Sequence, residues 1–135
     1  MTWRFVYRVL PVLVIRTDRL IPARFQGYNL GPIILLRPTA RAALLEHELT
    51  HSRQVYRTLF LMGAIYYLSK RWRLRWEAEA YAVQWKAGDS LANLSTFLAN
   101  NYHLGISVSE AQRAILGAAL GLAGGSGEAK TGEQQ

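Results

Sequence analysis

Three residues within one short segment have the types and the spacing of a metal-dependent hydrolytic site. Residues 47–51 read HELTH, which is an HExxH motif. In a helix, His47 and His51 lie one turn apart on the same face, where two imidazoles can bind one zinc ion. Glu48 lies beside that face, and its carboxylate can take a proton from a water molecule that the metal activates. The motif therefore predicts a Zn²⁺-dependent metallopeptidase with Glu48 as the catalytic base.

The motif needs a helix, and the local sequence predicts one. Residues 40–54 contain no Gly or Pro and are rich in good helix formers, and Thr39 is a candidate N-cap. At helical spacing, Leu44 and Val55 fall on the same side as the two histidines, so the imidazoles are expected to point inward. The alternative is an amphipathic helix that carries both histidines and Glu48 in solvent.

A catalytic zinc site has three protein ligands and leaves one position for water. A helical stretch downstream, which opens at residues 76–82, offers two carboxylates, Glu77 and Glu79. These residues are two positions apart, or about 200° around a helix, so both cannot face one metal ion. The residue types alone leave the choice between them open.

From roughly residue 30 to residue 86 the sequence resembles the small, minigluzincin-like members of the gluzincin-type zinc metallopeptidases. In that family a glutamate on a second helix completes the HExxH site, and this helix often reads ExxA followed by a polar residue; residues 77–81 read EAEAY. The resemblance implies a zincin-like fold, Glu77 as third ligand in preference to Glu79, and a bacterial or bacteriophage source. Many relatives carry Asp or Asn where this chain has Tyr81. We therefore expect Tyr81 either to donate a hydrogen bond in the site or to be half-buried packing.

Chain length and composition bound the architecture. With 135 residues, the chain is long enough for one domain with a single modest core, and its lack of cysteine excludes disulfides and thiolate metal ligands. Apolar segments at residues 4–10, 12–16 and 24–36, with a break at Pro11, predict an N-terminal sheet of about three strands. In the resembled fold this sheet packs on the HExxH helix. Residues 33–36 are the candidate edge strand for binding an extended peptide, and the alternative is an interior strand with no free edge.

The remainder of the chain is predicted to be helical, which makes the fold class α+β. Further helical segments are expected at residues 56–69, 76–88, 90–99 and 110–122. Residues 1–123 are therefore assigned to a single metallopeptidase-like domain. Residues 124–135 are polar and rich in glycine, and they are expected to form a disordered tail.

The formal net charge is +7, and part of it is concentrated beside aromatic residues. This basic cluster comprises Lys70, Arg71, Trp72, Arg73, Arg75 and Trp76. Such a cluster can bind nucleic acid or anionic lipid, or it can be a helix start whose tryptophans fill the core while the arginines are solvated or hold carboxylates. A third possibility is that one arginine orients Glu77 or a substrate carboxylate. A nucleic-acid- or membrane-binding module with a structural or vestigial metal site therefore stays open. So does a metal-dependent hydrolase of bonds other than peptide bonds.

Two apolar runs could be taken for a secretory signal or a membrane-associated helix. Residues 9–15 are interrupted by Pro11 and no small-x-small cleavage site follows, so we expect a strand rather than a secretory signal. Residues 59–68 are too short to span a bilayer, and a buried helix is expected there. The competing interpretation is a helix in the plane of a membrane surface, because Tyr66 and Tyr67 lie near the basic cluster. A cytoplasmic location is predicted, with peripheral membrane association open.

Peptide hydrolysis at zinc also needs a group that stabilises the developing oxyanion. His103, the third histidine of the chain, is one candidate, and Tyr56 and Tyr102 are others. A single histidine in a turn is more often a surface residue. The sequence therefore leaves the oxyanion donor unassigned.

Overall fold

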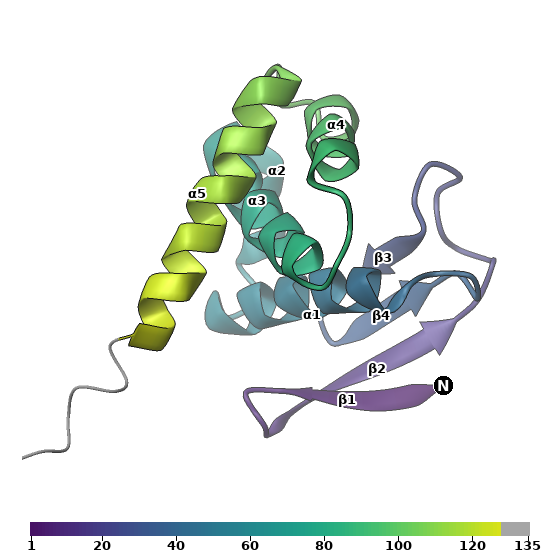
Figure 1. Cartoon of the computed structure of the whole chain (residues 1–135). Coiled ribbons are helices and arrows are strands. Elements are labelled where there is room, and N and C mark those ends of the chain that lie inside the picture. The colour runs from purple at the N-terminus through teal and green to yellow at the C-terminus, as the bar shows by residue number, and fades with distance from the viewer. Residues whose placement is uncertain (128–135) are drawn as a thin grey trace, which may run out of the picture.

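The strands come first in the chain and the helices follow (Figure 1). The computed structural model describes the backbone of residues 1–127 and the side chains of residues 1–122. The strands are β1 (Thr2–Val6), β2 (Leu10–Arg16), β3 (Gly27–Asn29) and β4 (Ile33–Leu36). The helices are α1 (Ala42–Arg57), α2 (Met62–Leu68), α3 (Lys70–Lys86), α4 (Leu91–Asn101) and α5 (Val108–Gly127). The predicted α+β class is confirmed, with a fourth strand because the third apolar segment divides into β3 and β4.

The sheet has the order β1-β2-β4-β3, which puts β4 in its interior. β2 and β4 run parallel, whereas β1 pairs with β2 and β3 with β4 in antiparallel fashion. The prediction that residues 33–36 form the edge strand is therefore wrong. Ile34, Leu35 and Leu36 are buried, and such a continuous apolar run is typical of a strand with neighbours on both sides. The edge beside α1 belongs to β3.

The predicted break at Pro11 is also wrong. The chain turns at residues 7–9, and Pro11 lies inside β2, opposite Phe5 of β1. β4 pairs with β2 only from Leu13 onward, so Pro11 has no neighbouring strand on that side to which an N–H could donate.

The start of α1 and the end of α5 differ from the predicted ones. α1 begins at Ala42, with Arg41 and not Thr39 at the N-cap position. α5 begins with a reciprocal pair of hydrogen bonds, in which the Glu110 N–H donates to Ser107 Oγ (3.1 Å) and the Ser107 N–H donates to Glu110 Oε2 (2.7 Å). It continues to Gly127, so the tail does not begin at residue 124. Residues 128–135, the rest of the predicted tail, lie outside the described residues.

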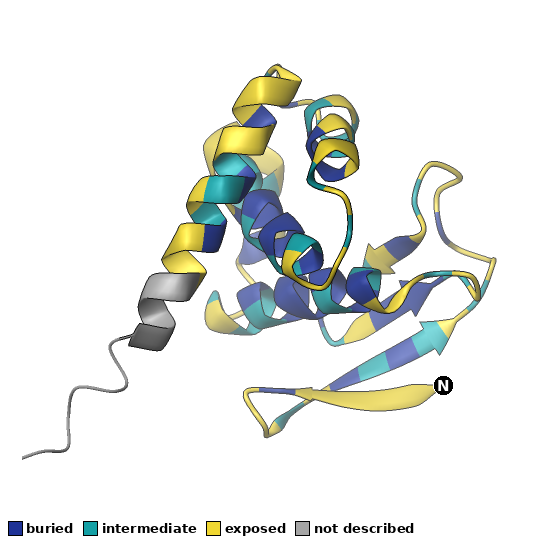
Figure 2. Cartoon of the chain, in the orientation of Figure 1, coloured by how far each residue is buried: buried dark blue, intermediate teal, exposed yellow. Residues whose placement is uncertain are grey.

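α1 lies between the sheet and the other helices (Figure 1), and a core forms on each side of it. One core joins the sheet to α1 and contains Val6, Val12, Val14, Ile34, Leu36, Leu45 and Leu49. The second joins α3, α4 and α5 and contains Tyr81, Ala82, Leu94, Leu98, Leu104, Ala111, Ile115 and Ala119. Figure 2 shows the resulting concentration of buried residues along α1 and α3. The HExxH helix is thus held from two sides.

The apolar run at residues 59–68 does not form the buried helix that the sequence predicts. Its first residues form a turn, and in α2 only Met62 is buried. Leu59, Leu61 and Leu68 are exposed. Within the described part of the chain, none of the helices has the length and hydropathy needed to cross a bilayer.

The basic cluster is part of α3, which begins at Lys70 rather than near residue 76. Trp76 is buried, and Arg73 is a structural residue. The Arg73 guanidinium donates to the backbone carbonyls of Tyr66 (3.0 Å), Tyr67 (2.9 Å) and Tyr102 (2.9 Å). The Arg73 side chain therefore connects α3 to the end of α2 and to Tyr102, the residue that follows α4.

Replacing Arg73 should destabilise the fold. Arg73→Met leaves three carbonyl groups without their charged donor, and we expect the free energy of unfolding to fall by about 2 kcal/mol. Denaturant unfolding followed by circular dichroism measures this change. Arg71→Met, which removes an exposed cation of the same cluster, is the control and should unfold close to the wild type. Equal stability of the two variants would contradict the role of Arg73.

Candidate metal centre

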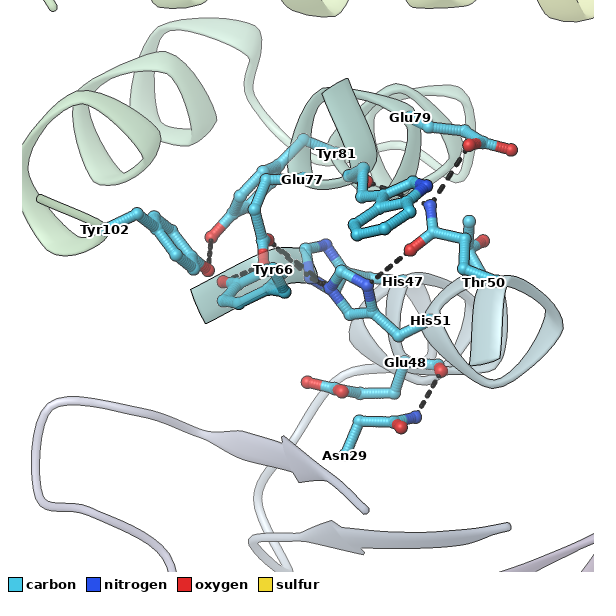
Figure 3. Close-up of polar contacts among 12 residues, drawn as sticks. Asn29, His47, Glu48, Thr50, His51, Tyr66, Glu77, Glu79, Tyr81 and Tyr102 are labelled. Carbon is cyan, nitrogen blue, oxygen red and sulfur yellow. Dashed lines mark hydrogen bonds and ion pairs between the residues drawn. The ribbon is translucent and has the colours of Figure 1, made fainter. Parts of the chain in front are cut away.

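The contact between α1 and α3 brings two histidines and one glutamate into a single buried cluster (Figure 3). Nε2 of His51 lies 3.1 Å from Nε2 of His47 and 3.3 Å from Oε2 of Glu77. The same Glu77 oxygen is 3.7 Å from His47 Nε2. All three potential ligand atoms lie within 4.8 Å of one another, and this is the arrangement that binding of one metal ion requires.

Glu77 and not Glu79 belongs to this cluster. The two side chains leave α3 in different directions (Figure 3), and the Glu79 carboxylate accepts hydrogen bonds from Gln54 Nε2 (3.1 Å) and Arg57 Nη2 (3.4 Å). Glu79 is therefore held by α1 on the far side of the histidines. The geometry resolves the choice that the residue types left open.

One oxygen of Glu77 accepts a hydrogen bond, and the other faces the two imidazoles. Tyr66 donates its hydroxyl proton to Glu77 Oε1 at 2.6 Å. Glu77 Oε2 is buried without a hydrogen-bond donor, although it faces both imidazoles. Burial acts to raise the pKa of Glu77, but the imidazoles and the Tyr66 hydroxyl outweigh it and lower the pKa below its usual range. An ionised oxygen and two imidazole nitrogens that converge on one point are a donor set that suits zinc.

The ring of His51 is oriented by Gln54. The amide Nε2 of Gln54 donates to the backbone carbonyl of Trp76 (3.0 Å) and to Glu79, so its Oε1 must face His51. That oxygen lies 2.9 Å from His51 Nδ1. Nδ1 is therefore the donor, and the lone pair of the neutral ring is on Nε2, toward the cluster. This is the tautomer that a metal ligand needs.

The two imidazoles differ in protonation. Burial, and then the charge of His51, lower the pKa of His47 to about 3, so His47 is neutral. Burial also acts to lower the pKa of His51, but the Glu77 carboxylate, with smaller contributions from Glu48 and Gln54, raises it to about 9. The three groups thus hold one proton that balances the charge of Glu77. Binding of a cation to both imidazoles must displace that proton.

Glu48 lies beside the cluster, on the side of β3 (Figure 3). It is almost fully buried. Burial is the main cause that raises the pKa of Glu48 to about 7, with His51 acting against it and Glu77 with it. A carboxylate with that pKa is basic enough to exchange protons near neutral pH.

The edge strand β3 is fitted closely around Glu48. A side chain at Gly27 would place its Cβ 2.7 Å from Glu48 Oε1, so any other residue there would force the carboxylate to shift from this position. Asn29 Nδ2 donates to the backbone carbonyl of Glu48 (2.7 Å) and to Ser52 Oγ (2.9 Å). The Gly31 N–H donates to Asn29 Oδ1 (2.7 Å), which fixes the asparagine side chain. These contacts join the HExxH helix to the strand.

The candidate oxyanion donors are spread over the site and its surroundings. The Tyr81 ring packs edge-on against the His47 ring, and the Tyr81 and Tyr102 hydroxyl oxygens lie 2.7 Å apart. His103 is exposed, with a φ of 53°, and lies on the wall of the cavity outside the metal cluster. Tyr56 donates to the Pro11 carbonyl in the sheet (2.8 Å) and does not line the cavity. Tyr102 and His103 are the candidates that line the cavity.

Sequence reasoning missed four residues of the site: Asn29, Ser52, Gln54 and Tyr66. Gln54 had a usable signal, because it follows His51 by three positions and so lies on the same helical face. Tyr66 and Asn29 had none, since their partners are distant in the sequence. Only the packing of α2 and β3 onto the site reveals them.

The cluster opens into a cavity of about 830 Å³. Its walls come from β3, from α1 and α2, and from the turn at residues 101–103. His47, Glu48, His51 and Glu77 all line it. A volume of this size is typical of binding sites for small molecules or short peptides.

No family model, curated protein or solved structure matches this chain. The assignment of a metal centre therefore depends on the geometry of these residues. That geometry contains three convergent donor atoms, a buried carboxylate oxygen without a hydrogen-bond donor, and a histidine with a fixed tautomer.

The metal cluster can be tested by substitution. Wild-type protein should hold stoichiometric Zn²⁺, and His47→Ala and Glu77→Ala should lose it because each removes one of three ligand atoms. Glu79→Ala is the matched control and should keep zinc, since the Trp76 carbonyl still holds Gln54. Metal analysis after dialysis measures the content. Wild-type protein that stays free of metal at neutral pH after zinc is supplied would contradict the assignment.

Proposed function

We propose that this protein is a zinc-dependent metallopeptidase with a zincin-like arrangement. The observation that carries the proposal is the buried cluster of His47, His51 and Glu77, with the carboxylate of Glu48 beside it in the same cavity. The HExxH helix packs on a small sheet and meets its glutamate ligand on a second helix. This arrangement agrees with the resemblance to small gluzincins.

The residues of the cluster divide the work of hydrolysis. His47, His51 and Glu77 would hold Zn²⁺, which polarises a scissile carbonyl and makes water acidic. Glu48 takes the proton from the attacking water and passes it to the leaving amine, which its raised pKa permits near neutral pH. Tyr66 keeps one oxygen of Glu77 occupied, so that the other oxygen faces the imidazoles. The proposed role of each of these side chains thus follows from the groups that it contacts.

The edge strand β3 provides a place for an extended substrate. β3 pairs with β4 on one side only, and its residues Gly27, Tyr28 and Asn29 line the cavity. A peptide segment can add to such an edge through backbone hydrogen bonds. The backbone of that segment would then run past Glu48 and the metal cluster. This geometry favours peptide bonds over other hydrolysable bonds.

Replacement of the base tests the reaction. Glu48→Gln keeps the size of the side chain but cannot accept a proton, so we expect zinc content to be retained and peptide turnover to fall by at least about 100-fold. The assay compares peptide, ester and simple amide substrates with the zinc-loaded protein. Peptide turnover that survives Glu48→Gln would remove Glu48 from the base role. Turnover of esters alone would point to a different hydrolase.

The space at Gly27 provides a second test that leaves the metal ligands untouched. Gly27→Ala puts a methyl group against Glu48 Oε1 and should displace the carboxylate, which we expect to lower turnover by about 10- to 100-fold at unchanged zinc content. Gly63→Ala is the matched control. Gly63 also lines the cavity, but a Cβ there has no atom within 4 Å. Equal activity of the two variants would contradict the positioning role of Gly27.

A further inference from the structure

The turn between α1 and α2 presents three consecutive large apolar side chains to solvent. Leu59 is 81 % exposed, Phe60 59 % and Leu61 63 %. Single exposed apolar residues are common, but a run of three is not, and contiguous exposed apolar surface marks interaction sites. The run lies directly after the HExxH helix.

The backbone of this turn is held in an unfavourable conformation. Leu59 has a φ of 49° and Phe60 a φ of 66°, which is the left-handed region that side chains with a Cβ rarely adopt. Hydrogen bonds from Leu59 N to Tyr56 O (3.2 Å) and from Phe60 N to Val55 O (2.9 Å) fix it there. Strain of this kind clusters at functional sites. The turn is therefore an ordered element that displays its apolar side chains.

Two residues at the end of α2 extend the same surface. Tyr67 is 83 % exposed and Leu68 85 % exposed. Leu61 and Leu68 are seven positions apart, which puts them on one face of a helix, and Phe60 and Tyr67 line the same cavity. We call this surface the apolar rim: Leu59, Phe60, Leu61, Tyr67 and Leu68.

The chain segment that carries the apolar rim is strongly basic. Between Glu48 and Glu77 the sequence contains no Asp or Glu, and its basic residues are Arg53, Arg57, Lys70, Arg71, Arg73 and Arg75. Lys70 and Arg71 follow Leu68 almost directly and are exposed, as is the neighbouring Trp72 at 42 %. Surfaces that lie in the interface of an anionic bilayer have this composition, in which exposed Leu, Tyr and Trp stand next to Lys and Arg.

We propose that the apolar rim inserts into the surface of an anionic lipid bilayer, with Lys70 and Arg71 against the lipid headgroups. The occupant follows from the combination of charge and apolarity, because a polyanion such as nucleic acid would satisfy the cations but not the exposed leucines. Phe60 and Tyr67 belong to both the apolar rim and the cavity wall, so the bilayer would lie beside the mouth of the cavity. The proposal does not depend on the metal site.

Sedimentation with lipid vesicles tests the proposal. Wild-type protein should pellet with phosphatidylcholine vesicles that contain phosphatidylglycerol and much less with phosphatidylcholine alone. Leu68→Glu should weaken binding to the anionic vesicles by about tenfold or more. The change removes an apolar side chain that would be buried in the bilayer, and it adds a carboxylate that the anionic headgroups repel. Leu20→Glu makes the same change at a leucine that is 84 % exposed in the loop before β3. This matched control should bind like the wild type.

Three controls make the outcome decisive. Circular dichroism should show native folding of both variants, and Leu61→Glu should repeat the effect of Leu68→Glu. His47→Ala should bind vesicles like the wild type, since it alters only the metal cluster. The proposal is overturned if wild-type protein ignores anionic vesicles, or if Leu68→Glu and Leu20→Glu bind equally. It is also overturned if the wild type is a lipid-free dimer that Leu68→Glu dissociates, because the apolar rim would then be a contact between two copies.

Discussion

The close contact of α1 with α3 places two imidazoles and a carboxylate in one buried volume, and the surrounding structure depends on balancing their charges. A buried carboxylate is costly unless it is paired and hydrogen-bonded. Glu77 meets this requirement through His51, His47 and the Tyr66 hydroxyl. Ala78 and Ala80 of α3, on either side of Glu79, are buried and add little bulk to the helix that carries Glu77. The same arrangement directs the second carboxylate oxygen at the point where the two imidazole nitrogens converge.

A second set of polar contacts keeps these groups in place. Gln54 connects His51 to Glu79, and the carboxylate that competes with Glu77 in the sequence thereby becomes part of the support. On the opposite side, Asn29 joins β3 to α1 at Glu48. Glu48 and the candidate metal cluster therefore derive their positions from different neighbours, Glu48 from the sheet and the cluster from the helices. Glu48 and both imidazoles share α1, whereas Glu77 comes from α3, so movement of α3 against α1 would separate Glu77 from the imidazoles.

The segment between Glu48 and Glu77 contributes to a buried polar site on one side and to an exposed apolar and basic surface on the other. Inward, it contributes His51, Gln54 and Tyr66 to a buried polar site. Outward, it carries exposed leucines and cations without a single acidic side chain. Phe60 and Tyr67 lie where the two surfaces meet, at the cavity wall. In the proposed membrane contact, this boundary would lie at the bilayer surface.

The sequence by itself determined the elements and residues that depend on local spacing. The HExxH helix and the α+β order follow from residues close together in the chain, and the family resemblance indicated Glu77. The tertiary structure alone decided which strand forms the edge, because Ile34 is interior only through its pairing with both β2 and β3. It also decided the contact of Tyr66 with Glu77 and the exposure of Leu59, Leu61 and Leu68. Pairing, burial and charge balance arise between distant segments, and local periodicity carries no record of them.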